Sequence, residues 1–311
     1  MNGPAARPIV GQELLLHMGF LVLIQVIWGV GWVFGKLALI DFPPMMMMAL
    51  RFGVLAVVFL PFMRWHPGKF RQIVIIALFG GALSFGLGFL AMTMAHDIAP
   101  LAIAANLGVP FATILSAIFL GDRIRIWRGS ALVIAFAGIL VASFDPRLFD
   151  DLPGVAFSAL SAFFWAVGTI MTRRLTGVGA LDLQGWVSVC AFPPLLAASL
   201  LFEPGSLGSI PHASWLGWAS LFYIIIGSSI IGHVGVTWLV QRHPFSLLGP
   251  YMLLAPIIGA ISGVLYLGDQ ISWRVVLGGA LTLLGVLVIT LRESRRKVPV
   301  PPPVAVEKPL E

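Results

Sequence analysis

Three residues near the N-terminal end of the chain have a spacing that could form one wall of a binding site. Gln25, Trp28 and Trp32 lie at positions i, i+3 and i+7, which share a helical face. A second stripe has similar spacing and consists of Ser158, Ser161, Trp165, Thr169 and Thr172. Packing between helices explains the serines and threonines, but tryptophan is bulky and its N–H needs a partner. We therefore predict that Gln25, Trp28 and Trp165 line an internal cavity; close helix packing is the alternative.

Arg51 is a cation within an apolar segment, where an unpaired charge is costly. It could contact the carboxylate of a bound molecule in a bidentate manner. It could instead reach the membrane surface or bond to helix-end carbonyls as a structural tie, which is the more ordinary role. Lys36 and Arg173 end their predicted helices, where a cation interacts favourably with the C-terminal dipole.

His233 stands in the middle of a predicted helix that also carries Tyr223. Because imidazole titrates near neutral pH, a proton carrier and a hydrogen-bonded structural histidine are both open readings. Phe85 lies among glycines in another predicted helix and can form an aromatic wall. We assign His233, Tyr223 and Phe85 to the predicted cavity, together with Tyr251.

Prolines interrupt two of the predicted helices. Pro110 frees the backbone carbonyl of Asn106, four residues earlier. A broken backbone is tolerated at membrane depth where it lines a cavity. We therefore predict Asn106 as a cavity residue and Pro110 as a hinge, and we predict Pro256, which follows Tyr251, as a second hinge.

Two Leu-Gly-Asp turns end at Asp122 and Asp269. Matching aspartates could suggest an acid–base dyad, but the topology derived below puts them on opposite sides of the membrane. Glycine favours the positive φ that ends a helix, and aspartate caps the next helix. The histidines are dispersed, no HExxH or GxSxG motif occurs, and the single cysteine, Cys190, excludes an internal disulfide. We expect no enzyme activity, no metal and no cofactor.

The composition requires a membrane environment. Of the 311 residues, 59% are hydrophobic and 10% are charged, and the mean hydropathy is +0.99. A soluble domain carries about 25% charged residues. Apolar runs of about 20 residues, enough to cross a bilayer, predict an all-α membrane protein with ten transmembrane helices. The expected spans are 15–38, 44–63, 72–94, 98–120, 127–144, 153–173, 183–202, 215–239, 245–267 and 274–291.

Lysine and arginine are distributed unevenly between the connections. With the N-terminus inside, 15 of the 19 cations fall in inside segments and 3 in outside loops. Cytoplasmic loops retain Lys and Arg, so both termini are predicted to be cytoplasmic. The same retention explains the net charge of +6 without a nucleic-acid partner.

The chain contains an internal repeat. The segments 28–36 and 165–173 each have tryptophan, glycine three residues later and a cation eight residues later, and the two Leu-Gly-Asp turns lie 147 residues apart. Each repeat holds five helices, an odd number, so the halves are inverted in the membrane. The predicted organisation is a cytoplasmic segment 1–14, five-helix repeats at 15–144 and 153–291, and a disordered cytoplasmic tail at 292–311.

Several short motifs occur in a fixed order along the chain: Trp28-Gly29, Asp41-Phe-Pro-Pro44, Leu50-Arg51-Phe52, Pro110, the two Leu-Gly-Asp turns and two Gly-rich helices. In these motifs and their duplication the sequence resembles the drug/metabolite transporter superfamily, in the ten-helix form with two EamA domains. The resemblance spans about residues 17–291, and its opening through Arg51 is most similar to exporters of cysteine, O-acetylserine or aromatic amino acids. Both Leu-Gly-Asp turns carry aspartate where the family usually has glutamate.

The resemblance implies a bacterial inner-membrane transporter that exports amino acids or related small metabolites by alternating access around a central cavity. Its expected partners are a small-molecule substrate and the lipid bilayer, and we expect a monomer. No Asp or Glu falls at mid-membrane depth in these spans, so a facilitator, an exchanger and a carrier linked to His233 remain open. A multidrug or cation exporter of the same fold is the alternative, followed by a channel and a membrane-embedded enzyme.

Overall fold

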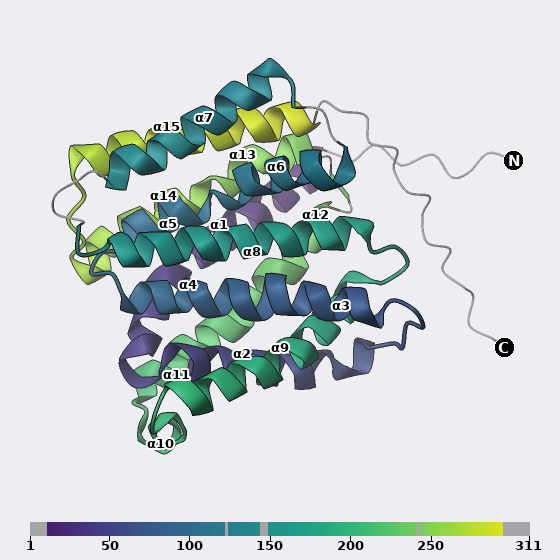
Figure 1. Cartoon of the computed structure of the whole chain (residues 1–311), viewed down its shortest axis with the longest axis vertical. Coiled ribbons are helices and arrows are strands. Elements are labelled where there is room, and N and C mark those ends of the chain that lie inside the picture. Colours follow the sequence, from purple (N-terminus) through teal and green to yellow (C-terminus); the bar gives the residue numbers. More distant parts are fainter. Residues whose placement is uncertain (1–10, 122–123, 144–148, 241, 244, 295–311) are drawn as a thin grey trace, which may run out of the picture.

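The computed structural model describes residues 11–121, 124–143, 149–240, 242–243 and 245–294, and these residues form helices joined by short connections without a β-strand. The predicted N-terminal segment and tail lie largely outside the described residues, and so does Asp122. Figure 1 shows long helices lying roughly parallel across the molecule. The all-helical fold class is confirmed for the described part of the chain.

The helices of the first half have these bounds: α1 Gly11–Asp41, α2 Pro44–Phe59, α3 Phe70–Ile76, α4 Ser84–Thr93, α5 Ala99–Ala105, α6 Gly108–Leu120 and α7 Ile126–Ser143. Those of the second half are α8 Leu152–Arg174, α9 Ala180–Phe202, α10 Ser206–His212, α11 Trp215–Phe222, α12 Gly235–Val240, α13 Phe245–Met252, α14 Leu254–Ser262 and α15 Trp273–Ser294. A 3₁₀ turn and three π-helical stretches continue some of them: η1 Leu60–Phe62, η2 Ala77–Leu83, η4 Tyr223–Val234 and η5 Gly263–Leu267.

The helices are those of a multi-pass membrane protein. Among the described residues, eight helical stretches are long and apolar enough to cross a bilayer. Two shorter apolar helices correspond to the two remaining expected spans. Ile126–Ala142 agrees with the expected span 127–144 to within two residues, and Leu254–Leu267 lies within the expected span 245–267. The count of ten spans, the cytoplasmic termini and the repeat boundaries stay predictions.

Small residues allow the most extensive helix contact in the fold, which joins α7 and α15, side by side at the top of Figure 1. A Cβ added at Gly138 would lie 2.5 Å from the backbone oxygen of Gly278. Backbone thus contacts backbone directly, as is typical of helix packing in lipid. On the opposite side of the molecule, α2 packs along α9.

Several helices are interrupted at mid-length, where a regular α-helix would be expected. The chain breaks between α5 and α6 at Asn106–Leu107 and between α13 and α14 at Leu253, and η4 is π-helical over twelve residues. The prolines at 110 and 256 each follow a break by a few residues, because proline cannot donate to the preceding turn. Irregular backbone in a membrane protein belongs inside the protein or beside a cavity.

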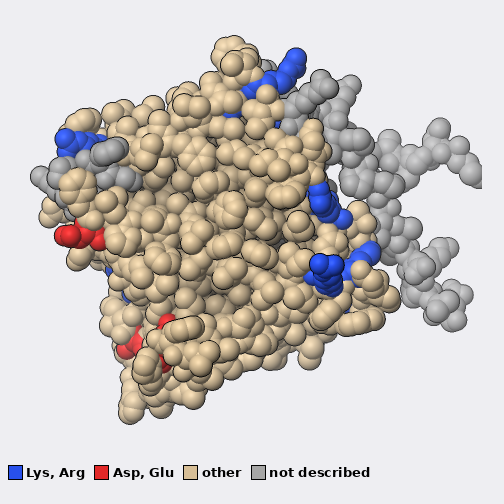
Figure 2. All heavy atoms as spheres, in the orientation of Figure 1, with Lys and Arg blue, Asp and Glu red and all other residues tan. Residues whose placement is uncertain are grey.

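The charged side chains lie near the ends of the helices. Figure 2 shows one face on which lysine, arginine and acidic residues stay close to the edges, with a broad uncharged band between them. Large apolar side chains such as Leu23, Val57 and Leu265 are exposed on the molecule, at 51%, 73% and 71% of their area. An uncharged band of this kind faces lipid.

Candidate functional site

Arg51 lies in the interior of the protein, on the inward face of α2, with 2% of its surface exposed. Its Nε donates to the hydroxyl oxygen of Ser229 in η4 at 2.9 Å. Its guanidinium carbon stands 4.2 Å from the centroid of the Phe85 ring, a cation–π contact. The side chain therefore does not reach the membrane surface, which excludes one of the roles considered for it.

His233 lies close to Phe85 and to Trp28. Its ring centroid lies 6.0 Å from that of Phe85 and 5.3 Å from that of Trp28, which it meets nearly at a right angle. His233 Nδ1 lies 3.0 Å from the backbone oxygen of Ser228. The Trp28 Nε1–H donates to the same oxygen, also at 3.0 Å. The predicted need of the partly buried indole for a partner is thus met by a backbone oxygen of the second half.

Tyr223 also contacts α1, at two points. Its hydroxyl donates to the backbone oxygen of Ile27 at 2.9 Å, and its ring stacks on Phe34 with centroids 4.1 Å apart. We call Trp28, Arg51, Phe85, Tyr223, Ser229 and His233 the central cluster. Its members come from α1, α2, α4 and η4, so both predicted repeats contribute.

The π-helical form of η4 positions several of these groups. Ser229 Oγ donates to the oxygen of Ile224 and His233 Nδ1 approaches that of Ser228, in each case five residues back along the chain. Wide turns of this kind are rare and concentrate at functional positions. Gly232 leaves room for the indole, because an added Cβ would lie 2.9 Å from Trp28 Cε2. The sequence signal for this irregular helix is the presence of Gly227, Ser228, Ser229 and Gly232 within six residues.

Gln25 is fully buried one turn before Trp28 on α1. Neither its amide nitrogen nor its amide oxygen has a hydrogen-bond partner among the described residues. Such an amide costs free energy unless something satisfies it. Tyr251, at the end of α13, belongs to the apolar cluster that also contains Trp28, Leu21 and Leu248.

The structure brings Asn106 and Trp165 to a different place. An added Cβ at Gly108, just after the break at Asn106, would lie 2.8 Å from Cε3 of Trp165. Pro110 has no N–H to donate to the carbonyl oxygen of Asn106. That oxygen accepts instead from Val109 N at 3.3 Å, in a tighter turn, so it is not left unpaired. Trp165 is 42% exposed, and no described contact joins it to the central cluster.

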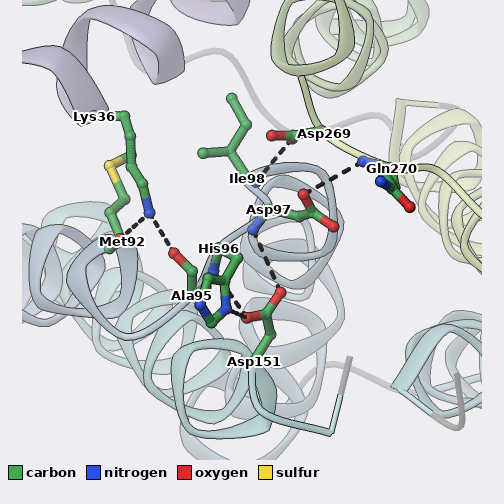
Figure 3. A network of polar contacts seen from close by, with 9 residues as sticks. All are labelled: Lys36, Met92, Ala95, His96, Asp97, Ile98, Asp151, Asp269 and Gln270. Carbon is green, nitrogen blue, oxygen red and sulfur yellow. Dashed lines mark hydrogen bonds and ion pairs between the residues drawn. The ribbon is translucent and has the colours of Figure 1, made fainter. Parts of the chain in front are cut away.

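Carboxylates tie loops together at one end of the helices (Figure 3). Asp269 Oδ2 accepts from the backbone N–H groups of Ile98 and Ala99 at 2.9 and 3.2 Å. Asp97 accepts from Gln270 N at 3.4 Å. Burial raises the pKa of both carboxyls, and each also feels a neighbouring carboxylate: Asp151 for Asp97, and Asp97 for Asp269. Asp269 therefore caps α5 in the other half, whereas we predicted that it would cap the helix that follows it.

Lys36 belongs to the same network (Figure 3). Its Nζ donates to the backbone oxygen of Met92 at 2.6 Å and to that of Ala95. The prediction that Lys36 ends its own helix is wrong, because α1 continues to Asp41. The cation instead meets a carbonyl in the last turn of α4 and one just beyond that helix, so the dipole it compensates is that of another helix.

Other carboxylates have the same structural role elsewhere. Glu203 accepts from the N–H groups of Met45 and Met46 in the first turn of α2, and Asp182 accepts from Arg64 N. These bonds explain why acidic residues stand at helix ends. Gly121 and Gly268 have φ of 70° and 78° and end their helices as predicted. Among the described residues, no three His, Cys, Asp or Glu side chains gather where they could hold a metal.

Comparison with known proteins gives consistent matches over the chain. A family model described as the EamA-like transporter family matches residues 16–144 and 152–291. A relative from Escherichia coli K12 named "Probable amino-acid metabolite efflux pump" is 24% identical over 86% of this chain and 92% of its own length. The "Uncharacterized inner membrane transporter YedA" of the same strain is 25% identical over 90% and 92%. A solved crystal structure is also similar, with a TM-score of 0.55 and 22% sequence identity. The match covers 86% of this chain and 96% of the other chain, and it supports the fold alone.

Proposed function

We propose that this chain, which belongs to the EamA-like transporter family, exports amino acids or related small metabolites across the bacterial inner membrane by alternating access. The relatives named as an amino-acid metabolite efflux pump and as an inner membrane transporter support the substrate class and the location. At about a quarter identity they do not identify one substrate. The argument for that class therefore rests on the central cluster.

The observation that carries the proposal is the environment of Arg51. The guanidinium is buried, and no carboxylate pairs with it in the part of the chain that the structure describes. Its described side-chain partners are the hydroxyl of Ser229 and, at 3.8 Å, the sulfur of Met48. A guanidinium has five N–H donors, and a buried cation without a counter-ion is costly. The carboxylate of a bound amino acid would supply that counter-ion.

The surroundings of Arg51 suit the remainder of such a molecule. Phe85 and Trp28 offer aromatic surfaces, and His233 lies between them. Gln25 provides an amide without a described partner one helical turn from Trp28. An apolar wall with a few polar groups is the usual form of a small-molecule site. It fits amphipathic carboxylates better than phosphates, which need several convergent cations.

Alternating access is supported by how the cluster is assembled. Its residues come from both repeats, and irregular backbone lies on several of the helices around it. Two halves that rock about such a site would expose it first to one side and then to the other. The breaks near Pro110 and Pro256 are the proposed hinges.

Exchange in proteoliposomes tests the substrate class. Vesicles loaded with a neutral amino acid such as phenylalanine are given the labelled compound, and competitors are added: other amino acids, the phenylalanine methyl ester and phenethylamine. We expect saturable exchange that amino acids inhibit and that the two analogues without a carboxylate inhibit at least ten-fold more weakly. Arg51→Met should abolish this discrimination.

The result also separates the alternative function. If labelled phenethylamine is exchanged and labelled phenylalanine is not, the protein is a cation exporter of the same fold and Arg51 is only a structural tie. Empty vesicles and Thr93→Ala, a change at an exposed residue whose hydroxyl bonds within its own helix, are the controls.

A further inference from the structure

Two histidines from distant parts of the chain meet at one end of α1. Nδ1 of His17 lies 2.7 Å from Nε2 of His243, which stands in the connection between α12 and α13. His243 is 5% exposed. The His17 ring also meets the edge of Trp238 at 4.8 Å between centroids, and the guanidinium of Arg242 lies 4.1 Å from the centroid of that indole. The contact therefore has a defined packing around it.

His243 and His96 occupy equivalent positions in the two predicted repeats. His243 follows His96 by 147 residues, the interval that separates Asp122 from Asp269. Toward the other end of α1, Lys36 donates to the backbone oxygen of Met92 in α4 and to that of Ala95, which lies in the connection after α4 next to His96. Two repeat-equivalent connections thus hold α1 near its two ends, one through carbonyl oxygens and one through a histidine pair.

The chemistry of the pair depends on protons. A neutral imidazole has one N–H and one lone pair, so a direct bond between two rings needs a proton on one nitrogen and none on the other. One additional proton leaves that bond intact. A second makes both facing nitrogens donors on two cations, and the contact becomes repulsive.

Two charged groups lie near the histidine pair in the sequence, Arg242 beside His243 and Glu13 on α1. Arg242 adds positive charge next to His243, and Glu13, an exposed residue one turn before His17 on α1, is the nearest acid on that helix. Burial, His17 and Arg242 lower the pKa of His243. When a base has a lower pKa in one state of the protein than in another, the first state becomes less stable relative to the second as the pH falls. Acid therefore disfavours the paired arrangement.

We propose that His17 and His243 form a pH-sensitive latch that holds this end of the transporter closed and releases it when both rings are protonated. Release would separate His17 on α1 from His243 and open a path toward the central cluster from this end. The latch adds regulation to the alternating access proposed above, and its existence does not depend on which substrate is carried.

Cysteine labelling of the purified protein tests the latch without a substrate. Leu21, one turn from His17, is fully buried against Leu239 and Leu248. It is replaced by cysteine in a Cys190→Ser background, and alkylation by a water-soluble maleimide is timed from pH 5.5 to 8. The reference is the same protein with His17→Asn and His243→Gln. These amides keep a hydrogen bond at the positions of Nδ1 and Nε2 but do not titrate.

The rate ratio of the histidine protein to the amide reference, taken at each pH, cancels the pH dependence of thiol chemistry. We expect a ratio near one at pH 8 that rises at least five-fold by pH 5.5. A ratio that stays within two-fold across this range overturns the proposal. A cysteine at Ile98, buried at the opposite end, should not show this rise, and a parallel rise there would mean general loosening and also overturn it.

Removal of the bond is the second arm. His243→Ala should give fast labelling at Leu21→Cys at all pH values, and protection equal to the unchanged pair at pH 8 would show that the contact does not hold this end closed. If that variant elutes as an aggregate, His17→Ala removes the same bond from the partly exposed side and is read in the same way. Failure of exchange assays would leave all these outcomes unaffected.

Discussion

Asp269 Oδ2 lies 2.9 Å from the backbone nitrogen of Ile98, a residue 171 positions earlier in the chain. In return Asp97 accepts the N–H of Gln270. Each half of the molecule thus supplies the carboxylate that fixes a backbone turn of the other half. A small set of hydrogen bonds joins the two halves at this end of the protein, and the proposed alternating access requires that such bonds break and re-form.

Replacing Asp269 should weaken the contact between the halves. Asp269→Ala removes the acceptor for two N–H groups at the start of α5, and loss of a cap of this kind costs about 1–2 kcal/mol. We expect a lower thermal midpoint in detergent. Asp269→Asn keeps one acceptor oxygen and should lose less than the alanine variant. Equal midpoints for all three proteins would mean that these bonds contribute nothing.

The same carboxyls predict a pH dependence of stability. The pKa values of Asp97 and Asp269 are raised above the ordinary value of 3.8 by burial. A raised pKa in the folded state means that the stabilisation is complete below the ordinary value and is lost as the pH rises through the raised one. Between pH 4 and the raised values, the wild type should therefore become less stable relative to an Asp97→Asn, Asp269→Asn double variant. Parallel curves measured by thermal unfolding would contradict this.

The sequence predicted the elements better than it predicted their partners. Apolar runs and proline positions locate the helices, because length and hydropathy in a bilayer are local properties. The bond between Arg51 and Ser229 joins residues 178 positions apart, and no local pattern pairs them. The serines and glycines before His233 were visible, but a π-helix depends on tertiary packing that sequence periodicity does not report.

Two errors have related physical causes. Lys36 was expected to end its own helix, yet it serves the end of α4, and Asp269 caps α5 in place of the following helix. Both inferences used the nearest helix terminus in the sequence. In a bundle with short connections, several termini meet at each end, so a charged side chain can reach a terminus from another part of the chain.

A close contact between α7 and α15 predicts a sharp difference between two glycines of α7. Gly138→Ala would place a Cβ 2.5 Å from backbone oxygen of Gly278 and force the helices apart, at a cost of about 1–3 kcal/mol. Gly129→Ala is the matched control, since its Cβ would have no neighbour closer than 3.9 Å. Alanine there should be neutral or stabilising by up to about 1 kcal/mol. Thermal unfolding of the two variants in the same detergent measures the difference.

Gly232 predicts an effect on transport. A Cβ at this position would overlap the indole of Trp28 and displace it from the backbone oxygen of Ser228. We expect Gly232→Ala to raise KM for exchange at least five-fold. Gly31→Ala is the control near the same wall, because its Cβ would meet only Tyr223 Cε1 at 3.9 Å. Equal KM values for the two variants would remove Trp28 from the proposed site.

Ser229 and its neighbour distinguish a binding role of Arg51 from a structural one. Ser229→Ala removes the hydroxyl that accepts from Arg51 Nε, so the guanidinium loses its fixed orientation. Ser228→Ala is the matched control, because the bonds from Trp28 and His233 use the backbone oxygen of Ser228, which the substitution retains.

If Arg51 binds the substrate carboxylate, Ser229→Ala should raise KM for amino acids three- to ten-fold, with a smaller effect on an ester analogue that is bound weakly from the start. Stability should also fall, by about 1–3 kcal/mol, because a buried charged donor loses its acceptor. A purely structural role predicts the loss of stability with KM unchanged. The two measurements, exchange kinetics and thermal unfolding of the same preparation, therefore separate the roles that the sequence left open, and an unchanged KM in Ser229→Ala would transfer carboxylate recognition away from Arg51.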